Sequence, residues 1–219
     1  MKKLSLIAML FCAAGVSAAN AGNIYLSEKL SFGFTTASNL TLDIPGTTMS
    51  GTDETGDTFG SNTAVGYDFG KVGAGNIRTE LEFGFGESSD YNTTNTHASA
   101  NGAKLDIHAN ALTVMANAYY DFDTGTKFSP YLGFGLGYTH VSVDTTPEDG
   151  IDTAKINHDG FVWNLGAGVS YNIDENWAVD LGYRWINFGN FSGKTKVNQH
   201  ELAGRLYEHE VLLGARYRF

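Results

Sequence analysis

Two residues of this chain, His140 and Ser142, are of the types that a serine esterase uses. That chemistry needs a base within hydrogen-bond reach of the hydroxyl and an acid that orients the base. Residues two apart on a strand point to the same face, so this pair can be neighbours without being catalytic. The sequence singles out no Asp or Glu as the third member. We therefore predict that the protein is not an enzyme.

Histidines and loop acids are the other candidates for chemistry. The histidines outside that pair are His97, His108, His158, His200 and His209. They lack the close spacing of a zinc site. The acids Asp144, Glu148, Asp149 and Asp152 could hold Ca²⁺ loosely, but they do not follow the order of an EF-hand loop and are more simply solvated charges. We predict no metal site and no cofactor.

Ten charged side chains occupy alternate positions within otherwise apolar segments, five of each sign. They are Lys29, Arg78, Glu80, Glu82, Asp180, Arg184, Glu208, Glu210, Arg216 and Arg218. Buried charges are costly unless they are paired. In a barrel whose interior is only wide enough for side chains, we expect these ten to form an ion-paired network that fills the lumen. The alternative is a narrow ion path.

The segments that carry these charges alternate with a period of two, which is the pattern of strands. In Ile77–Phe85, for example, every second residue is Ile, Thr, Leu or Phe, and the residues between them are Arg, Glu and Gly. The eight predicted strands are Ile24–Phe34, Thr63–Phe69, Ile77–Phe85, Leu112–Phe122, Pro130–Tyr138, Phe161–Tyr171, Trp177–Trp185 and Tyr207–Phe219. An even number of strands suits a closed antiparallel barrel with both termini on one side.

The connections between the predicted strands are of two kinds. Short turns follow the even-numbered strands at Gly70–Gly75, Asp123–Lys127 and Asn172–Asn176. Long polar stretches follow the odd-numbered strands at Thr35–Ser61, Glu87–Ala103, Ser142–Asp159 and Asn187–Leu206. This asymmetry is typical of outer-membrane barrels. We predict an all-β, eight-stranded antiparallel transmembrane barrel with short periplasmic turns and four long extracellular loops.

Composition supports a membrane barrel over a soluble one. Charged residues make up 17% of the 219 residues, against about 25% in soluble proteins. Aromatic residues gather at strand ends, as at Tyr119, Tyr120, Trp177 and Trp185, where the interfacial girdles of a membrane barrel lie. In a soluble β-sandwich or lipocalin-like barrel the apolar residues would point inward. Outside the N-terminus, no stretch approaches the ~18 consecutive apolar residues of a membrane helix.

Residues 1–21 have the features of a cleaved secretory signal peptide, which leaves residues 22–219 as the barrel domain. Lys2 and Lys3 precede an apolar run, and Ala19-Asn20-Ala21 supplies the cleavage pattern. Cleavage removes Cys12, the one cysteine, and changes the net charge from −10 to −12 through the two lysines. An acidic exported chain is unsuited to nucleic acid, because phosphate contacts need a basic surface.

Several segments resemble the opacity-type, OmpA-like family of small outer-membrane β-barrels. They are Arg78-Thr79-Glu80-Leu81-Glu82-Phe83, Pro130–Tyr138, Asp180-Leu181-Gly182-Tyr183-Arg184-Trp185 and His209–Phe219. The resemblance implies a location in the outer membrane and a role as a structural protein or surface antigen whose loops mediate adhesion or host interaction. It also implies that the terminal aromatics, Tyr217 and Phe219, form part of the signal read by the barrel-assembly machinery.

The resemblance implies partners as well. They are outer-membrane lipid and lipopolysaccharide, the assembly machinery and an extracellular host ligand, with the barrel as a monomer. Two alternative functions stay open. One is a lipid A-modifying enzyme, because His140-Val141-Ser142 resembles the His-x-Ser of the lipid A deacylase, although the surrounding pattern is absent. The other is a small, narrow-pore channel.

One residue conflicts with the predicted alternation. Glu28 shares its parity with Leu26, Leu30 and Phe32, so a regular strand would aim its carboxylate at lipid. A charge there costs up to a few kcal/mol near the bilayer midplane, less for Asp or Glu or near the interfaces. We expect a bulge, or a position at the periplasmic rim, to relieve that cost.

Overall fold

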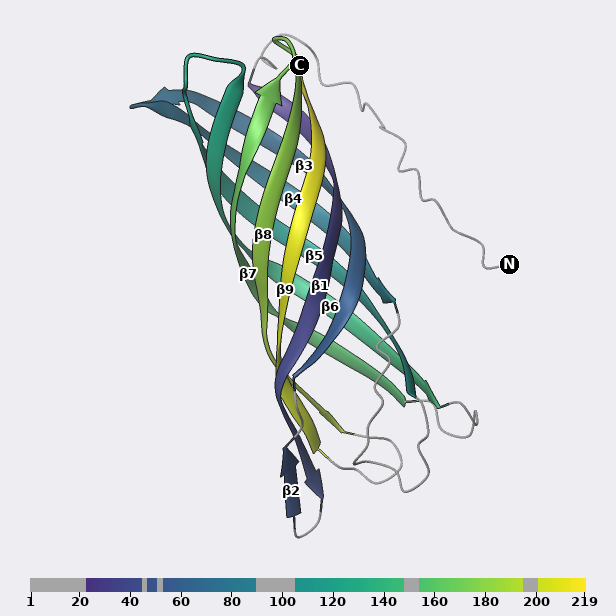
Figure 1. The fold of residues 1–219 in the computed structure, drawn as a ribbon. Helices are drawn as coiled ribbons and strands as arrows, with labels where there is room; N and C mark the ends of the chain where they lie inside the picture. Colours follow the sequence, from purple (N-terminus) through teal and green to yellow (C-terminus); the bar gives the residue numbers. More distant parts are fainter. Residues whose placement is uncertain (1–22, 45–46, 51–52, 90–104, 148–153, 195–200) are drawn as a thin grey trace, which may run out of the picture.

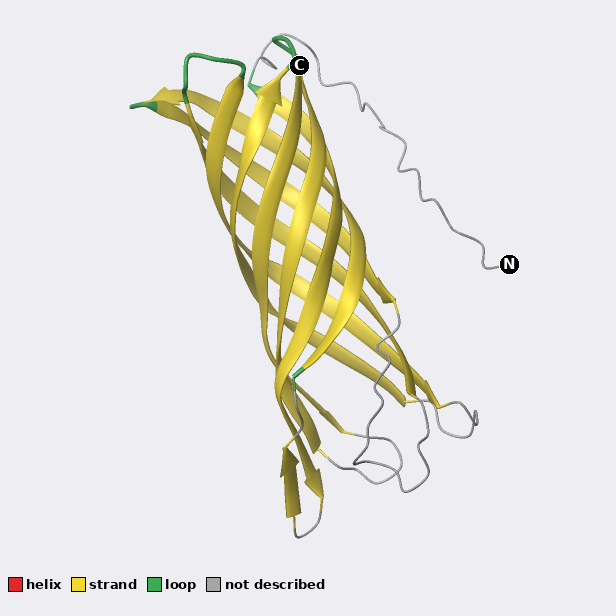
Figure 2. Ribbon diagram, in the orientation of Figure 1, coloured by secondary structure: helices red, strands yellow, loops and turns green. Residues whose placement is uncertain are grey.

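The computed structural model describes residues 23–44, 47–50, 53–89, 105–147, 154–194 and 201–219, and nearly all of them lie in strands (Figure 2). The strands are β1 Ile24–Ile44, β2 Thr47–Ser50, β3 Glu54–Val72, β4 Gly75–Ser89, β5 Leu105–Phe122, β6 Phe128–Pro147, β7 Ala154–Asn172, β8 Trp177–Lys194 and β9 Glu201–Arg218. Within these ranges there is no helix long and apolar enough to cross a membrane.

Eight of the strands form a closed antiparallel barrel (Figure 1). The ring order is β1-β3-β4-β5-β6-β7-β8-β9, and β9 pairs back onto β1. The short β2 lies outside the ring and pairs only with the far end of β1, from Thr41↔Ser50 to Ile44↔Thr47. The predicted eight-stranded antiparallel barrel is confirmed, with β2 as an addition to it.

The apolar face of each strand points outward, and the polar face points into the barrel. On β4, Leu81 and Phe83 are 49% and 51% exposed, whereas Glu82 between them is fully buried. An apolar outer wall around a polar interior is the arrangement of a membrane barrel and the reverse of a soluble one. The lipocalin-like alternative is therefore excluded.

The outward apolar residues form a belt whose height matches the hydrocarbon core of a bilayer. On β6 the belt runs from Phe128 to Tyr138, eleven residues of tilted strand, and the next outward residue is His140. A transmembrane strand needs about 9–11 residues. On each strand the belt ends where the first outward polar residue follows, and we call that level the outer rim. On the other seven strands of the ring the belt residues that border it are Phe34, Phe59, Phe85, Leu112, Phe161, Trp185 and Val211.

The strands continue well beyond the outer rim, which corrects the predicted loops. The stretch Thr35–Ser61, predicted as one loop, is largely strand, because β1 runs to Ile44 and β3 begins at Glu54. The other three long stretches are shortened in the same way by β4 and by β6 to β9. Outside the bilayer both faces of a strand meet water, so no apolar alternation marks it in the sequence. Backbone pairing nevertheless continues from the belt outward.

The short turns lie at the opposite end, as predicted, but the first is shorter than Gly70–Gly75 because β3 runs to Val72 and β4 begins at Gly75. Gly73 and Ala74 join β3 to β4, and the turns 123–127 and 173–176 join β5 to β6 and β7 to β8. Gly73 has a φ of +65°, a conformation that glycine adopts without strain. The start of β1 and the C-terminal end of β9 lie at this same end (Figure 1).

Glu28 points outward in a regular strand, so both expected forms of relief are wrong. The pairing of β1 with β3 is unbroken from Ile24 to Ala37, and Ile24 and Leu26 lie between Glu28 and the short-turn end. Two hydroxyls of β3 stabilise the carboxylate instead. Ser61 Oγ donates to Glu28 Oε1 at 2.7 Å, and Thr63 Oγ1 donates to Oε2 at 2.5 Å. Bonds of this kind replace part of the hydration that the carboxylate loses.

Candidate functional site

The ten predicted lumen charges all come from the inward faces of β1, β4, β8 and β9, and all but Arg218 are buried. At their centre Lys29 Nζ lies 2.5 Å from Glu80 Oε2 and 2.6 Å from Glu82 Oε2. Arg78 joins the other side of this group, with Nη1 at 3.0 Å from Glu80 Oε1 and Nε at 2.7 Å from Asp121 Oδ2. Each central charge thus contacts opposite charges.

The same network continues across the barrel to β8 and β9. Arg184 Nη1 lies 2.5 Å from Glu82 Oε1, and Arg184 Nε lies 2.6 Å from Glu210 Oε2. The third nitrogen of the guanidinium, Nη2, donates to Asn62 Oδ1 at 3.3 Å. Ion pairs therefore run without a break from β5 through β4, β1 and β8 to β9.

Two further ion pairs lie toward the short-turn end. Arg216 Nη2 donates to Asp180 Oδ1 at 3.1 Å and to Ser170 Oγ at 3.0 Å. Arg218, whose side chain is 40% exposed, places Nη2 at 3.1 Å from Asp68 Oδ2. These two pairs occupy the lumen between the central network and the turns.

Glu208 is the predicted lumen acid that the structure does not place in this chain of ion pairs. It is buried next to Glu210 and takes hydrogen bonds from Thr35 and Thr58. The two threonine hydroxyls also contact each other at 3.0 Å. Glu208 lies above the central network, toward the outer rim, where the two threonine hydroxyls bind its carboxylate.

Aromatic rings complete the lumen, and one of them corrects an expectation. Tyr119, which we expected in the interfacial girdle, points inward, and Tyr120 takes the outward position. The Arg78 guanidinium lies 4.0 Å from the centroid of the Tyr119 ring and 5.2 Å from that of Tyr131. Cation–π contacts of this kind strengthen when they are shielded from water. Tyr25 packs from β1 against Gly66, where any Cβ would overlap its ring.

Two lumen acids, Asp68 and Asp121, were absent from the predicted set. Both are close to the short-turn ends of their strands, and Asp121 directly follows Tyr119 and Tyr120, which we assigned to a girdle. Their odd or even position along the strand, which decides the face a side chain points to, could have identified them as inward residues. Asp121 has the parity of the inward Asn117 and Tyr119, and Asp68 has the parity of the inward Ala64 and Gly66.

The predicted assembly residues close the barrel at its C-terminal strand. Tyr217 lies 4.9 Å from Trp177 and 5.2 Å from Phe219, measured between ring centroids. The Phe219 backbone N–H donates to the carbonyl of Ile24 at 3.1 Å. The terminal aromatic residue therefore joins the last strand to the first.

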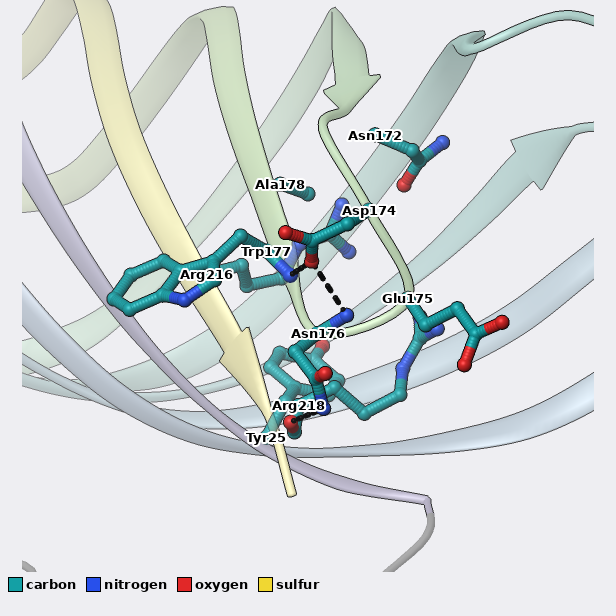
Figure 3. A pocket seen from close by; sticks show the side chains of 9 residues that line it. All are labelled: Tyr25, Asn172, Asp174, Glu175, Asn176, Trp177, Ala178, Arg216 and Arg218. Atoms are coloured by element: carbon teal, nitrogen blue, oxygen red, sulfur yellow. Dashed lines mark hydrogen bonds between the residues drawn. The ribbon is translucent and has the colours of Figure 1, made fainter.

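Polar side chains order the turns at the same end. Figure 3 shows the Asp174 carboxylate directed at the backbone N–H groups of Trp177 and Asn176, at 2.8 and 2.9 Å. These two bonds hold the pKa of Asp174 below its usual value, and the bond from Trp177 has the larger effect. In the turn between β5 and β6, a hydrogen bond from Lys71, at 2.9 Å, lowers the pKa of Asp123.

The structure places His140 and Ser142 on the outward face of β6 at the outer rim, and it adds an acid that the sequence did not single out. His140 Nδ1 lies 2.5 Å from Asp159 Oδ1 on β7, and Ser142 Oγ lies 3.4 Å from His140 Nε2. The pairing of β6 with β7 places Asp159 directly opposite His140.

The other candidates for chemistry are only partly described. His97, His200, Glu148, Asp149 and Asp152 lie outside the described residues, as do the side chains of His108, His158 and Asp144. His209 points outward, and its Nδ1 lies 2.5 Å from the Tyr183 hydroxyl. Among the residues that the structure describes, no three His, Cys, Asp or Glu side chains are grouped as metal ligands.

Comparison with known proteins agrees with this architecture. The family profile of the outer membrane protein beta-barrel domain matches residues 4–219. The chain belongs to that family. As a member of it, the protein is an integral outer-membrane barrel, with its short turns on the periplasmic side and its long connections on the extracellular side.

Individual relatives of this outer-membrane barrel are more distant. The outer membrane protein PagN of Salmonella typhimurium is 29% identical over 184 residues, which cover 76% of this chain and 75% of PagN. A Rickettsia conorii protein described as an adhesin is 26% identical over 165 residues, covering 68% of this chain and 66% of that protein. The crystal structure of Neisserial surface protein A superposes with a TM-score of 0.55 at 21% identity, covering 90% of this chain and 97% of the other, which shows a shared fold.

Proposed function

We propose that this barrel is a surface protein that binds a host cell or its matrix through the strand ends that stand above the outer rim. The observation that carries the proposal is the length of those ends. β1 continues from Phe34 at the belt to Ile44, and β2 adds a hairpin to its far end (Figure 1). A membrane anchor needs none of this, because about 9–11 residues of strand cross the bilayer.

The projecting strands give a rigid support to the loops that they carry. Binding residues concentrate on loops that a rigid scaffold positions. Backbone pairing between β1 and β9 continues far above the belt, past a register shift between Ser38 and Thr41, for example at Asp43↔Glu201. The adhesin assignment of the Rickettsia relative supports the same role for this chain.

The lumen is suited to stability rather than transport. The central ion pairs join β4 to β1 and β8, so they cross the interior at the level of the belt. We assign these charges to a structural plug, in place of the narrow ion path. A monomer anchored by the surrounding lipid, with no cofactor, is sufficient for a binding role.

Binding by loop-shortened variants tests the proposal. In one variant a Gly-Ser turn replaces residues 40–52, and in others it replaces residues 90–104, 148–153 or 195–200. Refolded proteins are measured for binding to cultured epithelial cells and to extracellular matrix. We expect at least one deletion to reduce binding about tenfold, a loss of about 1.4 kcal/mol, while the barrel still assembles.

A change at the other end of the barrel is the matched control. A Gly-Ser replacement of Thr124–Thr126 alters a periplasmic turn and should leave binding unchanged. Barrel assembly is monitored in each variant by heat-modifiable gel migration. Equal binding by the intact protein and every extracellular deletion would refute the proposed function.

A further inference from the structure

We infer that the outer rim carries a second, catalytic site: a Ser–His–Asp triad that hydrolyses acyl esters of amphiphiles in the outer leaflet. Ser142 is the nucleophile, His140 is the general base, and Asp159 is the positioning residue. This activity is independent of the adhesive role proposed above. It also departs from our prediction, made from the sequence, that the protein is not an enzyme.

The two ring nitrogens of His140 have the two partners that a triad requires. Nδ1 lies 2.5 Å from Asp159 Oδ1, so the carboxylate fixes the tautomer with the proton on Nδ1. Nε2 is then an acceptor, and it lies 3.4 Å from Ser142 Oγ. Such nucleophile-to-base distances are often longer before substrate binds. The order of contacts is that of a serine hydrolase.

The barrel wall fixes this arrangement. His140 pairs directly with Asp159, and Ser142 pairs directly with Asn157, so the four residues form a square on the outward faces of β6 and β7. Paired strands position side chains more rigidly than loops do. His140 and Asp159 are 48% and 54% exposed, which leaves them accessible to a substrate that approaches from outside the barrel.

Asn157 supplies the remaining requirement, a donor for the negative oxygen that forms on the substrate. Ser142 Oγ donates to the Asn157 side-chain oxygen Oδ1 at 3.1 Å. The oxygen and nitrogen of an amide are interchangeable at this position by a turn of the side chain. In the turned orientation Nδ2 is directed at the nucleophile, where it can donate to an oxyanion, and the Ser142 proton is directed at His140.

The position of the square relative to the belt defines the substrate class. Tyr138 and Phe161, which are 58% and 59% exposed, lie directly below His140 and Asp159 on the same strands. Leu112 lies beside His140 on β5 and is 54% exposed. A fatty acyl chain in the outer leaflet can lie along these residues, and its ester group then reaches the level of Ser142.

The reaction proceeds by acyl transfer. Ser142 Oγ attacks the ester carbonyl carbon while His140 Nε2 takes its proton, and the carbonyl oxygen becomes the oxyanion beside Asn157. The ester C–O bond breaks, and His140 returns the proton to the departing alcohol. Water, deprotonated by His140, then hydrolyses the acyl-serine, which releases the fatty acid and restores Ser142. One ester and one water become one acid and one alcohol.

Protein refolded from inclusion bodies, free of native membrane enzymes, tests the site. It is mixed with micelles or vesicles of a diacyl glycerophospholipid, or with an acylated glucosamine lipid, and released fatty acid is measured. We expect release of fatty acid from at least one of these two lipids, and the lipid that reacts identifies the source of the ester. Ser142→Ala and His140→Gln should reduce it at least ~100-fold. Asp159→Asn should lower kcat, and Asp159→Glu, which keeps the carboxylate, should have a higher kcat than Asp159→Asn.

Ser192→Ala, at an exposed serine of β8, is the matched control and should keep full activity. A fluorophosphonate probe followed by peptide mass mapping should label Ser142 in the wild type and leave Ser142→Ala unlabelled at that peptide. Heat-modifiable migration shows that each variant is folded. Absence of release from both lipids by folded wild type, or equal release by Ser142→Ala, would overturn the inference.

Discussion

Arg184 and Glu82 are 102 positions apart in the chain and lie on opposite walls of the barrel, yet Nη1 of the one lies 2.5 Å from Oε1 of the other. In the ring order of the strands, β8 is four places from β4, which is as far apart as two strands of an eight-stranded ring can be. The contact therefore joins the two walls at the centre of the lumen. Both side chains are almost completely buried.

Removing the Arg184 guanidinium should destabilise the barrel. Arg184→Met leaves Glu210 without a cationic partner and leaves Glu82 with Lys29 alone, and loss of one member of a buried pair costs about 3–5 kcal/mol. We expect a decrease of about 3 kcal/mol in the free energy of unfolding, measured by denaturant titration in lipid micelles. Lys71→Met, which removes an exposed ion pair to Asp123, should change little.

The same pair should determine whether the lumen conducts. In planar bilayers the intact protein should show no stable single-channel openings, because side chains fill an eight-stranded barrel. The double variant Glu82→Ala, Arg184→Ala removes the contact that spans the lumen and should show measurable openings. Steady, large openings of the unmodified protein would instead favour the narrow-channel alternative.

The hydroxyl of Ser61 should matter only while Glu28 is present. Ser61→Ala removes a hydrogen bond to a charged group in the lipid belt, and we expect a loss of about 1.5 kcal/mol of unfolding free energy. In a Glu28→Leu background the same substitution should cost little, because no carboxylate remains to be stabilised. A double-mutant cycle measured in micelles gives the coupling. Equal costs in both backgrounds would show that Ser61 acts independently of Glu28.

Asp174 should contribute to stability at neutral pH and lose that contribution in acid. Its pKa is lowered in the folded state by the N–H groups of Trp177 and Asn176, so the folded state favours the ionised form. The contribution is then complete above the unfolded pKa of about 3.9 and disappears as pH falls through the lower, folded value. The unfolding free energies of wild type and Asp174→Asn should differ at pH 7, and the difference should shrink as the pH falls below about 3.9. A gap that is independent of pH would contradict this.

The barrel itself followed from local patterns in the sequence. Strand identity, strand number and the direction of each face could be predicted from period-two alternation, as in Ile77–Phe85. Lipid selects apolar side chains on one face over the full width of the bilayer, which leaves a readable signal. Above the outer rim that selection ends, so the continuation of β1 to Ile44 and the presence of β2 appeared only in the folded chain.

The sequence by itself determined which charged side chains face the lumen, because parity along a strand decides that. It could not determine partners. The contact of Arg184 with Glu82 depends on barrel closure, which brings opposite walls within reach. The contact of His140 with Asp159 depends on the register between β6 and β7, which a shift of one residue would abolish. Closure and register are properties of the whole set of paired strands, so only the tertiary structure decided them.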